Sequence, residues 1–140
     1  MDFETVSPDA LGRSLRGVGV NLLCRDVAGT VAFVVAVFGL RPHRAGPDFA
    51  LLTHDGALIQ LHSDASFRAH PALGLIPEAG PRGGGVQLYL FGVDPDAAAA
   101  RADAAGGVVL EPPTDKPHGL REATILGPEG HAFSPAVARR

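Results

Sequence analysis

The chain has 140 residues, a formal net charge of −3 and a hydrophobic fraction of 46%, which fits a single globular domain. Its basic residues are scattered and form no stripe, so we expect no nucleic-acid partner. No apolar run approaches the roughly 20 residues of a transmembrane helix, and the N-terminus is too polar for a signal peptide, so we expect a cytoplasmic protein without a membrane partner. Cys24 is the only cysteine, which excludes a disulfide framework and a thiolate metal site and favours a small apolar core residue.

The first half of the chain predicts a strand, a helix and three further strands. Residues 1–16 have weak periodicity and are expected to form an N-terminal extension. Gly17 to Cys24 alternates as a strand, Asp26 follows at a turn, and Thr30 to Phe38 is predicted as a helix that ends at Gly39. Its β-branched residues favour a strand, but the corresponding run in the second half is helical by composition. The three strands are predicted at residues 40–45, 48–54 and 57–62, the last two joined by an Asp-Gly hairpin turn.

A linker rich in proline and glycine is predicted between the two halves. Residues 63–84 carry Pro71, Pro77 and Pro81 and lead into the triplet Gly83-Gly84-Gly85. The second half then repeats the order of the first half. It predicts a strand at residues 86–91, a helix at 97–105, a strand at 108–111, a loop at 112–119 and strands at 120–126 and 132–137.

The two halves have the form of two copies of one small unit. Asp26 and Asp94 stand before the two helices and are 68 residues apart, while Gly39 and Gly106 end them and are 67 residues apart. The acid-glycine hairpin turns of the two halves are offset by 74 residues. We therefore predict an α+β fold of two βαβββ modules.

This ordered set of features resembles the vicinal oxygen chelate superfamily, which includes glyoxalase I, extradiol dioxygenases and bleomycin-resistance proteins. The first copy retains Asp26, Phe33 and the run Phe38-Gly39-Leu40. The second copy retains the runs Gln87-Leu88-Tyr89-Leu90, Pro112-Pro113, Gly119-Leu120-Arg121-Glu122 and Pro128-Glu129-Gly130-His131. The resemblance implies one domain at residues 17–138, in which module 1 (17–63) and module 2 (85–138) fold a mixed sheet into a cup that holds a ligand.

Metal-dependent members of that superfamily hold a divalent metal in the cup with four donors. The resemblance places these positions at Gly19, Gln60, Gln87 and Ser134. Glycine offers no side-chain donor, a neutral serine is a poor ligand, and two amides do not hold a catalytic metal. A shift of two residues keeps the same strand face and adds Asn21, His62 and Tyr89, of which only His62 is a strong donor. We therefore expect no metal and no cofactor.

Arg121 and Glu122 are adjacent in a predicted strand, so their side chains face opposite ways. Parity with Ala123 and Ile125 favours Arg121 as the residue that points into the cup. Glu122 is then left for a surface ion pair.

The candidate ligand site consists of the residues that the resemblance brings to the cup. They supply amides, one imidazole, one phenol and one guanidinium, which orient a ligand without making bonds: Asn21, Gln60, His62, Gln87, Tyr89, Phe91, Arg121 and Ser134. The leading hypothesis is a small-molecule binding protein of the bleomycin-resistance type. It would sequester an apolar or aromatic compound, an antibiotic or a metabolite, without chemistry.

Two other functions are possible, and a second copy of the chain is the expected protein partner. The alternative is a metal-dependent, glyoxalase-like lyase, isomerase or dioxygenase with atypical ligands. The third is an interaction module whose cup is filled by its own side chains. A homodimer is expected because open sheet edges need cover and bilobal relatives pair two chains, and the linker is long enough to exchange modules between chains.

Overall fold

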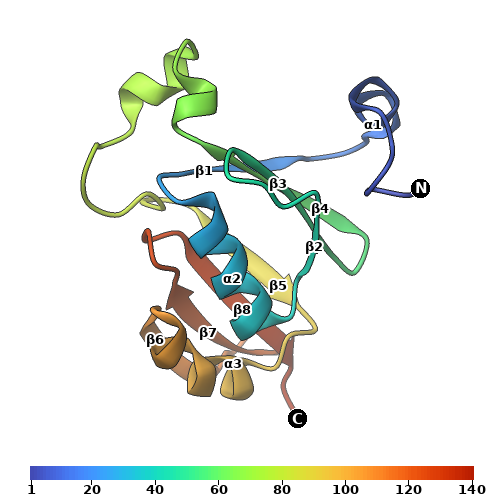
Figure 1. The fold of residues 1–140 in the computed structure, drawn as a ribbon. Coiled ribbons are helices and arrows are strands. Elements are labelled where there is room, and N and C mark those ends of the chain that lie inside the picture. Colours follow the sequence, from blue (N-terminus) through green and yellow to red (C-terminus); the bar gives the residue numbers. More distant parts are fainter.

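A computed structural model describes residues 1–140 and contains two four-stranded sheets, shown in Figure 1. Sheet 1 has the spatial order β1-β4-β3-β2 and consists of β1 (Val20–Cys24), β2 (Arg41–His43), β3 (Phe49–His54) and β4 (Ala57–Ser63). Sheet 2 has the matching order β5-β8-β7-β6 and consists of β5 (Gln87–Phe91), β6 (Val108–Asp115), β7 (Leu120–Leu126) and β8 (Ala132–Ala138). The α+β fold of two βαβββ modules is confirmed.

The strands pair in the same way in each module. The first strand pairs in parallel with the last, β1 with β4 and β5 with β8, and the other pairings are antiparallel. A parallel pair needs a crossover, and the helices α2 (Val27–Phe38) and α3 (Pro95–Ala102) follow the first strand of each module. α3 continues into the short 3₁₀ helix η3 (Asp103–Ala105). The sequence repeat is therefore a structural repeat.

Helix α2 forms although its valines favour a strand. The Asp26 side chain caps its N-terminus by accepting a hydrogen bond from the Gly29 N–H, and Gly39 ends it with a left-handed φ of 70°. Three of its residues, Phe33, Val34 and Val37, are at most 2% exposed. Burial of this face outweighs the modest helix penalty of β-branched residues, which is a few tenths of a kcal/mol each.

Two details of the strands bear on the sequence predictions. The predicted Asp-Gly hairpin turn between β3 and β4 is confirmed, with positive φ at both Asp55 (45°) and Gly56 (82°). The predicted loop at residues 112–119 is wrong in its first half, because β6 continues to Asp115. β6 is an edge strand with register shifts between Val109 and Thr114, where prolines without an N–H are tolerated.

The remaining short helices lie outside the two modules. α1 (Pro8–Ser14) belongs to the N-terminal extension and projects from the body in Figure 1. The linker contains two 3₁₀ helices, η1 (Ala65–Phe67) and η2 (Pro71–Leu75). No helix combines the length and the hydropathy that crossing a membrane requires.

One hydrophobic core joins both modules within the chain. The rings of Phe33 and Phe38 on α2 lie 6.3 and 5.2 Å from that of Phe133 on β8. A β-carbon on Gly107 would lie 2.6 Å from the Phe33 ring, so this glycine lets α2 approach sheet 2. Cys24 belongs to the same core, as expected, and burial raises the pKa of its thiol to about 12.

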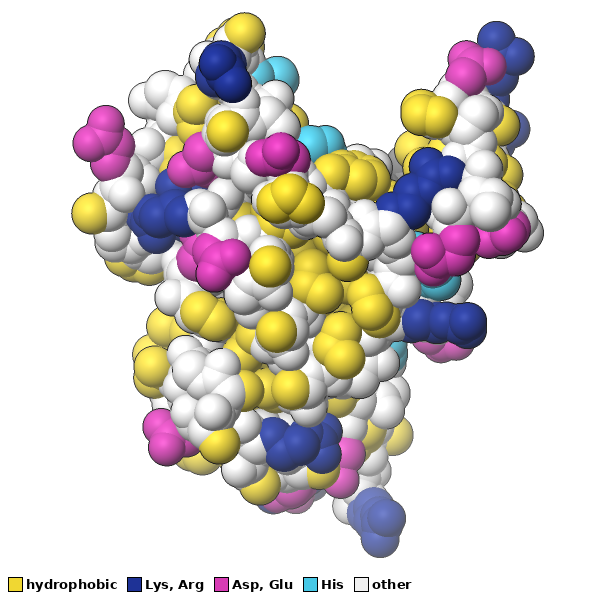
Figure 2. Space-filling view, viewed as in Figure 1, with side chains coloured by type: hydrophobic (Ala, Val, Ile, Leu, Met, Phe, Trp, Pro, Cys, Tyr) yellow, Lys and Arg dark blue, Asp and Glu magenta, His cyan; other side chains and the backbone are white.

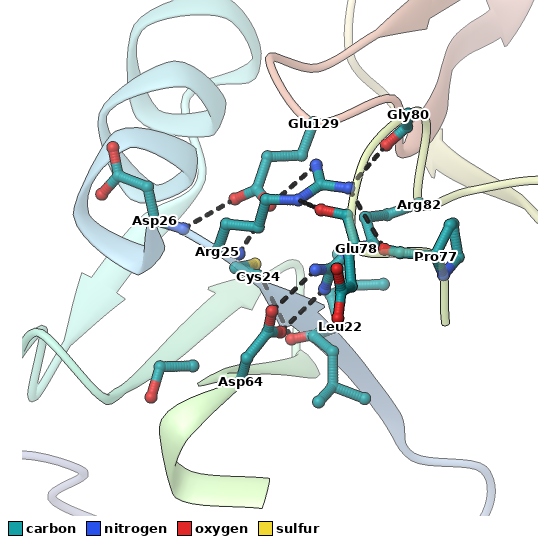
Figure 3. A network of polar contacts seen from close by, with 12 residues as sticks. Leu22, Cys24, Arg25, Asp26, Asp64, Pro77, Glu78, Gly80, Arg82 and Glu129 are labelled. Carbon is teal, nitrogen blue, oxygen red and sulfur yellow. Dashed lines mark hydrogen bonds and ion pairs between the residues drawn. The ribbon is translucent and has the colours of Figure 1, made fainter. Parts of the chain in front are cut away.

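Glu129, in the turn between β7 and β8, fastens module 2 to module 1 (Figure 3). Its carboxylate accepts hydrogen bonds from the backbone N–H groups of Arg25 (2.6 Å) and Asp26 (3.0 Å), directly before α2. The Arg25 guanidinium donates to backbone carbonyls of the linker, at Glu78 (2.9 Å) and Gly80 (2.8 Å). The Glu129 carboxylate therefore ties module 2 to the start of α2, and Arg25 ties the same point to the linker.

Glu129→Gln is expected to lower the free energy of unfolding by about 1–3 kcal/mol, because charged hydrogen bonds at a nearly buried carboxylate become neutral ones. Chemical denaturation followed by circular dichroism measures this. Glu78→Gln is the matched control, since only the backbone of Glu78 contacts Arg25 and its side chain is exposed. Equal losses in the two variants would contradict the fastening role.

Candidate functional site

The strands of both sheets alternate between a core face and an open face. Leu22, Leu61 and Leu90 belong to or pack on the core, so their strand neighbours point to the opposite side. In sheet 1 the open face carries Asn21, Gln60 and His62. In sheet 2 it carries the side chains of Gln87, Tyr89, Phe91, Glu122, Thr124 and Ser134.

A cavity of about 830 Å³ lies over the open face of sheet 2. We call it the sheet-2 cavity. Its floor comes from β5, β7 and β8, one wall from the end of the linker and another from the segment between β6 and β7. Its lining includes Gly83, Val86, Gln87, Tyr89, Leu110, Glu111, Lys116, His118, Glu122, Thr124 and Leu126.

Two further cavities continue along the open face. One of about 370 Å³ lies between β1 and β5 and is lined by Asn21, Leu23, Val86 and other residues. The other, of about 870 Å³, lies between the N-terminal extension and the strands and is bordered by Gln60 and Tyr89. Val86 borders both the sheet-2 cavity and the cavity of about 370 Å³, and Tyr89 borders both the sheet-2 cavity and the cavity of about 870 Å³. The three cavities are therefore neighbours, and we refer to them together as the groove.

A short chain of hydrogen bonds orders the floor of the sheet-2 cavity. The Gln87 Nε2–H donates to Ser134 Oγ at 2.6 Å, and Ser134 Oγ lies 3.3 Å from Thr124 Oγ1. Either hydroxyl of the Ser134–Thr124 pair can be the donor, because a hydroxyl oxygen can accept two hydrogen bonds. The floor thus offers a ligand the Gln87 Oε1 atom as an acceptor and the Thr124 hydroxyl as a further polar group.

The open face of sheet 1 is more apolar. The Asn21 Oδ1 atom lies 2.7 Å from His62 Nδ1, so Nδ1 carries the proton and Nε2 is left as an acceptor. Rings of Phe49 and Phe67 flank that imidazole, with centroids 4.9 and 5.2 Å away. Burial lowers the pKa of His62, which keeps the ring neutral at pH 7.

Glu122 is the one nearly buried carboxylate on the open face of sheet 2. Its side chain is 4% exposed, and one of its oxygens lies 3.0 Å from His118 Nε2. Its proximity to the Tyr89 hydroxyl raises the pKa of that phenol. Lys116 and Glu111 form an ion pair of 2.5 Å at the rim of the same cavity.

The predicted orientation of Arg121 is wrong. Ala123 and Ile125 are fully buried in the core, so Arg121 shares the helix side of β7. Its guanidinium pairs with Asp96 of α3 at 2.8 Å, away from the cup, and lies 3.2 Å from Asp115. Ordinary alternation explains this, because the apolar positions of β7 face the helix layer and the polar ones face the groove.

The structure brings some of the predicted residues together and separates others. Gln87 and Tyr89 line the sheet-2 cavity, with Ser134 fully buried directly beneath Gln87. Asn21 and Gln60 lie on the sheet-1 side of the groove. Phe91 is exposed beside Tyr89, and His62 lies under the linker aromatics. Sequence reasoning missed Glu111, Lys116, His118, Glu122 and Thr124.

The four positions at which relatives would hold a metal do not fit one here. Gly19 has no donor atom, and Ser134 is fully buried and already bonded to Gln87 and Thr124. Gln60 is the remaining amide. No group of three or more histidine, cysteine or acidic side chains is placed to hold a metal ion. The arrangement therefore suits hydrogen bonding and stacking.

Glu122→Gln is expected to lower the pKa of Tyr89 towards the ordinary value of about 10, because a neutral amide does not repel the phenolate. Tyr89 is the only tyrosine and the chain has no tryptophan, so its ultraviolet absorbance titrates this one group. Asp103→Asn, an exposed substitution on η3, is the control and should leave the pKa unchanged. Identical titrations of wild type and Glu122→Gln would rule out the contact.

Solved structures with a similar fold include several glyoxalase-related proteins. A glyoxalase/bleomycin resistance protein/dioxygenase family enzyme from Burkholderia phytofirmans PsJN is 22% identical, with a TM-score of 0.70 over 86% of this chain and 96% of that one. A glyoxalase-related enzyme from Fulvimarina pelagi is 23% identical, with a TM-score of 0.70 over 88% of each chain. TioX from Micromonospora sp. ML1 is 24% identical, with a TM-score of 0.61 over 89% of this chain and 98% of that one.

At these identities the similarity shows the fold alone. Comparison with curated proteins gave no match. The family model of the glyoxalase/bleomycin resistance protein/dioxygenase superfamily matches residues 18–134, from just before β1 to the middle of β8. The chain therefore belongs to the glyoxalase/bleomycin resistance protein/dioxygenase superfamily.

Proposed function

We propose that this protein binds an apolar or aromatic small molecule in the groove over its two sheets and holds it without chemistry, in the manner of a bleomycin-resistance protein. The observation that carries the proposal is the stacked pair of Tyr89 and Phe91, whose rings lie 5.3 Å apart at an interplanar angle of 11°. Both side chains are exposed on the open face, at 38% and 58%. Tyr89 borders the sheet-2 cavity and Phe91 extends the aromatic surface beside it, and exposed aromatic side chains next to a cavity are typical of a ligand site.

The size of the groove supports the same proposal. The sheet-2 cavity alone has about 830 Å³, within the range of roughly 300–1,000 Å³ that small-molecule sites occupy. A module whose cup was filled by its own side chains would leave no such space. The hypothesis of a filled interaction module therefore disagrees with the open groove.

The chemistry of the floor favours binding over metal-dependent catalysis. Glycine and a buried, fully bonded serine occupy two of the four positions where a metal would need donors. Metal analysis of the purified protein tests the alternative directly. A divalent metal bound in stoichiometric amount, and lost together with an activity on chelation, would replace the binding proposal with an enzymatic one.

A thermal-shift screen of antibiotics and planar aromatic metabolites is expected to yield a ligand that raises Tm. At about 100 times its Kd such a ligand adds about 2.7 kcal/mol to the free energy of unfolding. Phe91→Leu should then weaken binding by about 0.5–1.5 kcal/mol through lost stacking, and Gln87→Leu by about 1–3 kcal/mol through an unpaired polar group.

Gln60→Leu distinguishes the two halves of the groove, since Gln60 lies on the sheet-1 side. If the ligand spans both modules, Gln60→Leu should weaken its binding as well. Unchanged affinity in all three variants, with unchanged stability, would place the ligand elsewhere.

We also infer a homodimer, and α2 supplies its contact surface. Apolar side chains gather at the centre of the face that carries α2 (Figure 2). The outward positions of this helix are all apolar and only partly buried or exposed: Ala28, Val31, Ala32, Val35 and Ala36. A helix that is apolar on every side is normally covered, and a symmetric pair of chains is the commonest cover. Both modules share a core within one chain, so module exchange is not required.

Light scattering at micromolar concentration is expected to give a mass near twice the 14.4 kDa of one chain. Ala32→Glu should shift this to one chain, because a charge in an apolar interface is costly to bury. Ala100→Glu makes the same change at an exposed position of α3 and should leave the dimer intact. A wild-type mass of one chain would rule the dimer out.

A further inference from the structure

The sheet-2 cavity contains an acid that neither stability nor the proposed stacking explains. Glu122 lies in the interior of β7, where Thr114 of β6 and Ala136 of β8 are its cross-strand neighbours. Its side chain is 4% exposed and lines the cavity. Burying a carboxylate is costly unless a positive charge or strong hydrogen bonds compensate it.

The charges around the cavity leave Glu122 without a permanent partner. Lys116, the only lysine or arginine in the lining, is bound to Glu111 at 2.5 Å. His118 approaches Glu122 to 3.0 Å but is charged only when it is protonated. The lining therefore carries two carboxylates against one ammonium group, and Glu122 holds the unbalanced negative charge.

Aromatic surface adjoins this carboxylate. Tyr89 lines the same cavity as Glu122, and the Tyr89 ring stacks on that of Phe91. A positive charge near Glu122 would also lie beside the Tyr89 ring, and aromatic rings attract cations. The floor adds only neutral groups at Gln87 and Thr124.

We propose that the ligand of this groove is a cationic amine attached to a planar aromatic system. This rests on the proposed function and names its ligand class. The ammonium group binds the Glu122 carboxylate, with His118 and Tyr89 at its sides, and the aromatic part lies against Tyr89 and Phe91. An aromatic carboxylate of the same shape is repelled by Glu122 and binds weakly. The charge of the ligand, more than its outline, sets the specificity.

Matched pairs of amine and carboxylate test this: 9-aminoacridine and acridine-9-carboxylate, tryptamine and indole-3-propionate, and 1-naphthylmethylamine and 1-naphthoate. Isothermal titration calorimetry on the full chain at pH 7 measures each Kd. The amines are expected to bind at least about 10-fold more tightly than the carboxylates. Glu122→Gln should weaken the amines about 10-fold to 100-fold and leave the carboxylates unchanged or tighter.

Two further variants make the result specific. Asp103→Asn removes an exposed acid on η3 and should change no Kd, since Asp103 does not line the cavity. Lys116→Met removes the positive charge from the rim and should tighten the amines. If Glu122→Gln does not fold, Lys116→Met still tests the preference for amines, because it leaves Glu122 unchanged.

The outcomes separate this inference from the proposed function. Carboxylates that bind as well as the amines, or amines that are indifferent to both Glu122→Gln and Lys116→Met, would overturn the amine preference and leave the aromatic groove standing. If none of the six compounds binds at millimolar concentration, both proposals fail. Amine-selective binding that depends on Glu122 supports them together.

Discussion

The carboxylate of Glu129 is the contact on which the geometry of the groove depends. It sits in the β7–β8 turn of module 2 and accepts the backbone N–H groups of Arg25 and Asp26 in module 1. A helix N-terminus carries partial positive charge, so an acid there is favourable, and this one is nearly buried. The same turn binds the linker, since the Glu129 carbonyl accepts from the Arg82 N–H at 2.8 Å. Loss of this one side chain would loosen the start of the helix and the module boundary together.

Module 1 also contacts module 2, through a residue next to its own hairpin turn. His54, the last residue of β3 before the β3–β4 turn, lies with its Nε2 2.7 Å from the Phe91 carbonyl oxygen at the end of β5. In each module, a residue in or next to the last hairpin turn thus contacts the first strand or helix of the other module. His131 adds a third contact, with Nε2 3.1 Å from the Leu23 carbonyl oxygen. These contacts align β1 and β5 without hydrogen-bonding them as one sheet, which leaves the cavity between them.

Local chemistry made most of the fold predictable. Caps at Asp26 and Gly39, the Asp55-Gly56 turn and the recurrence of the same features in the second half all follow from short-range rules. The site was less accessible, because it depends on which face of a strand points to the helices. At β7 the sequence prediction chose the wrong face of the strand. It placed Arg121 in the cup, whereas the cavity is lined by the nearly buried Glu122 and Arg121 forms an ion pair on the helix side. Lys116 and His118 could not be found from spacing, since they line the cavity from the turn that joins β6 to β7 and not from a strand.

The polar residues of the groove form hydrogen bonds with one another, and these bonds determine which of their atoms remain available. Ser134 Oγ accepts from Gln87 and contacts Thr124, while His62 Nδ1 donates to Asn21. A metal would have to break these contacts to reach the lone pairs that they occupy. An organic ligand need not break them, since the Gln87 Oε1 atom takes part in none of these contacts. Since the bonded side chains stand on paired strands, the floor is already ordered before a ligand arrives. An ordered floor loses little conformational entropy when a ligand binds, which favours affinity from a modest number of contacts.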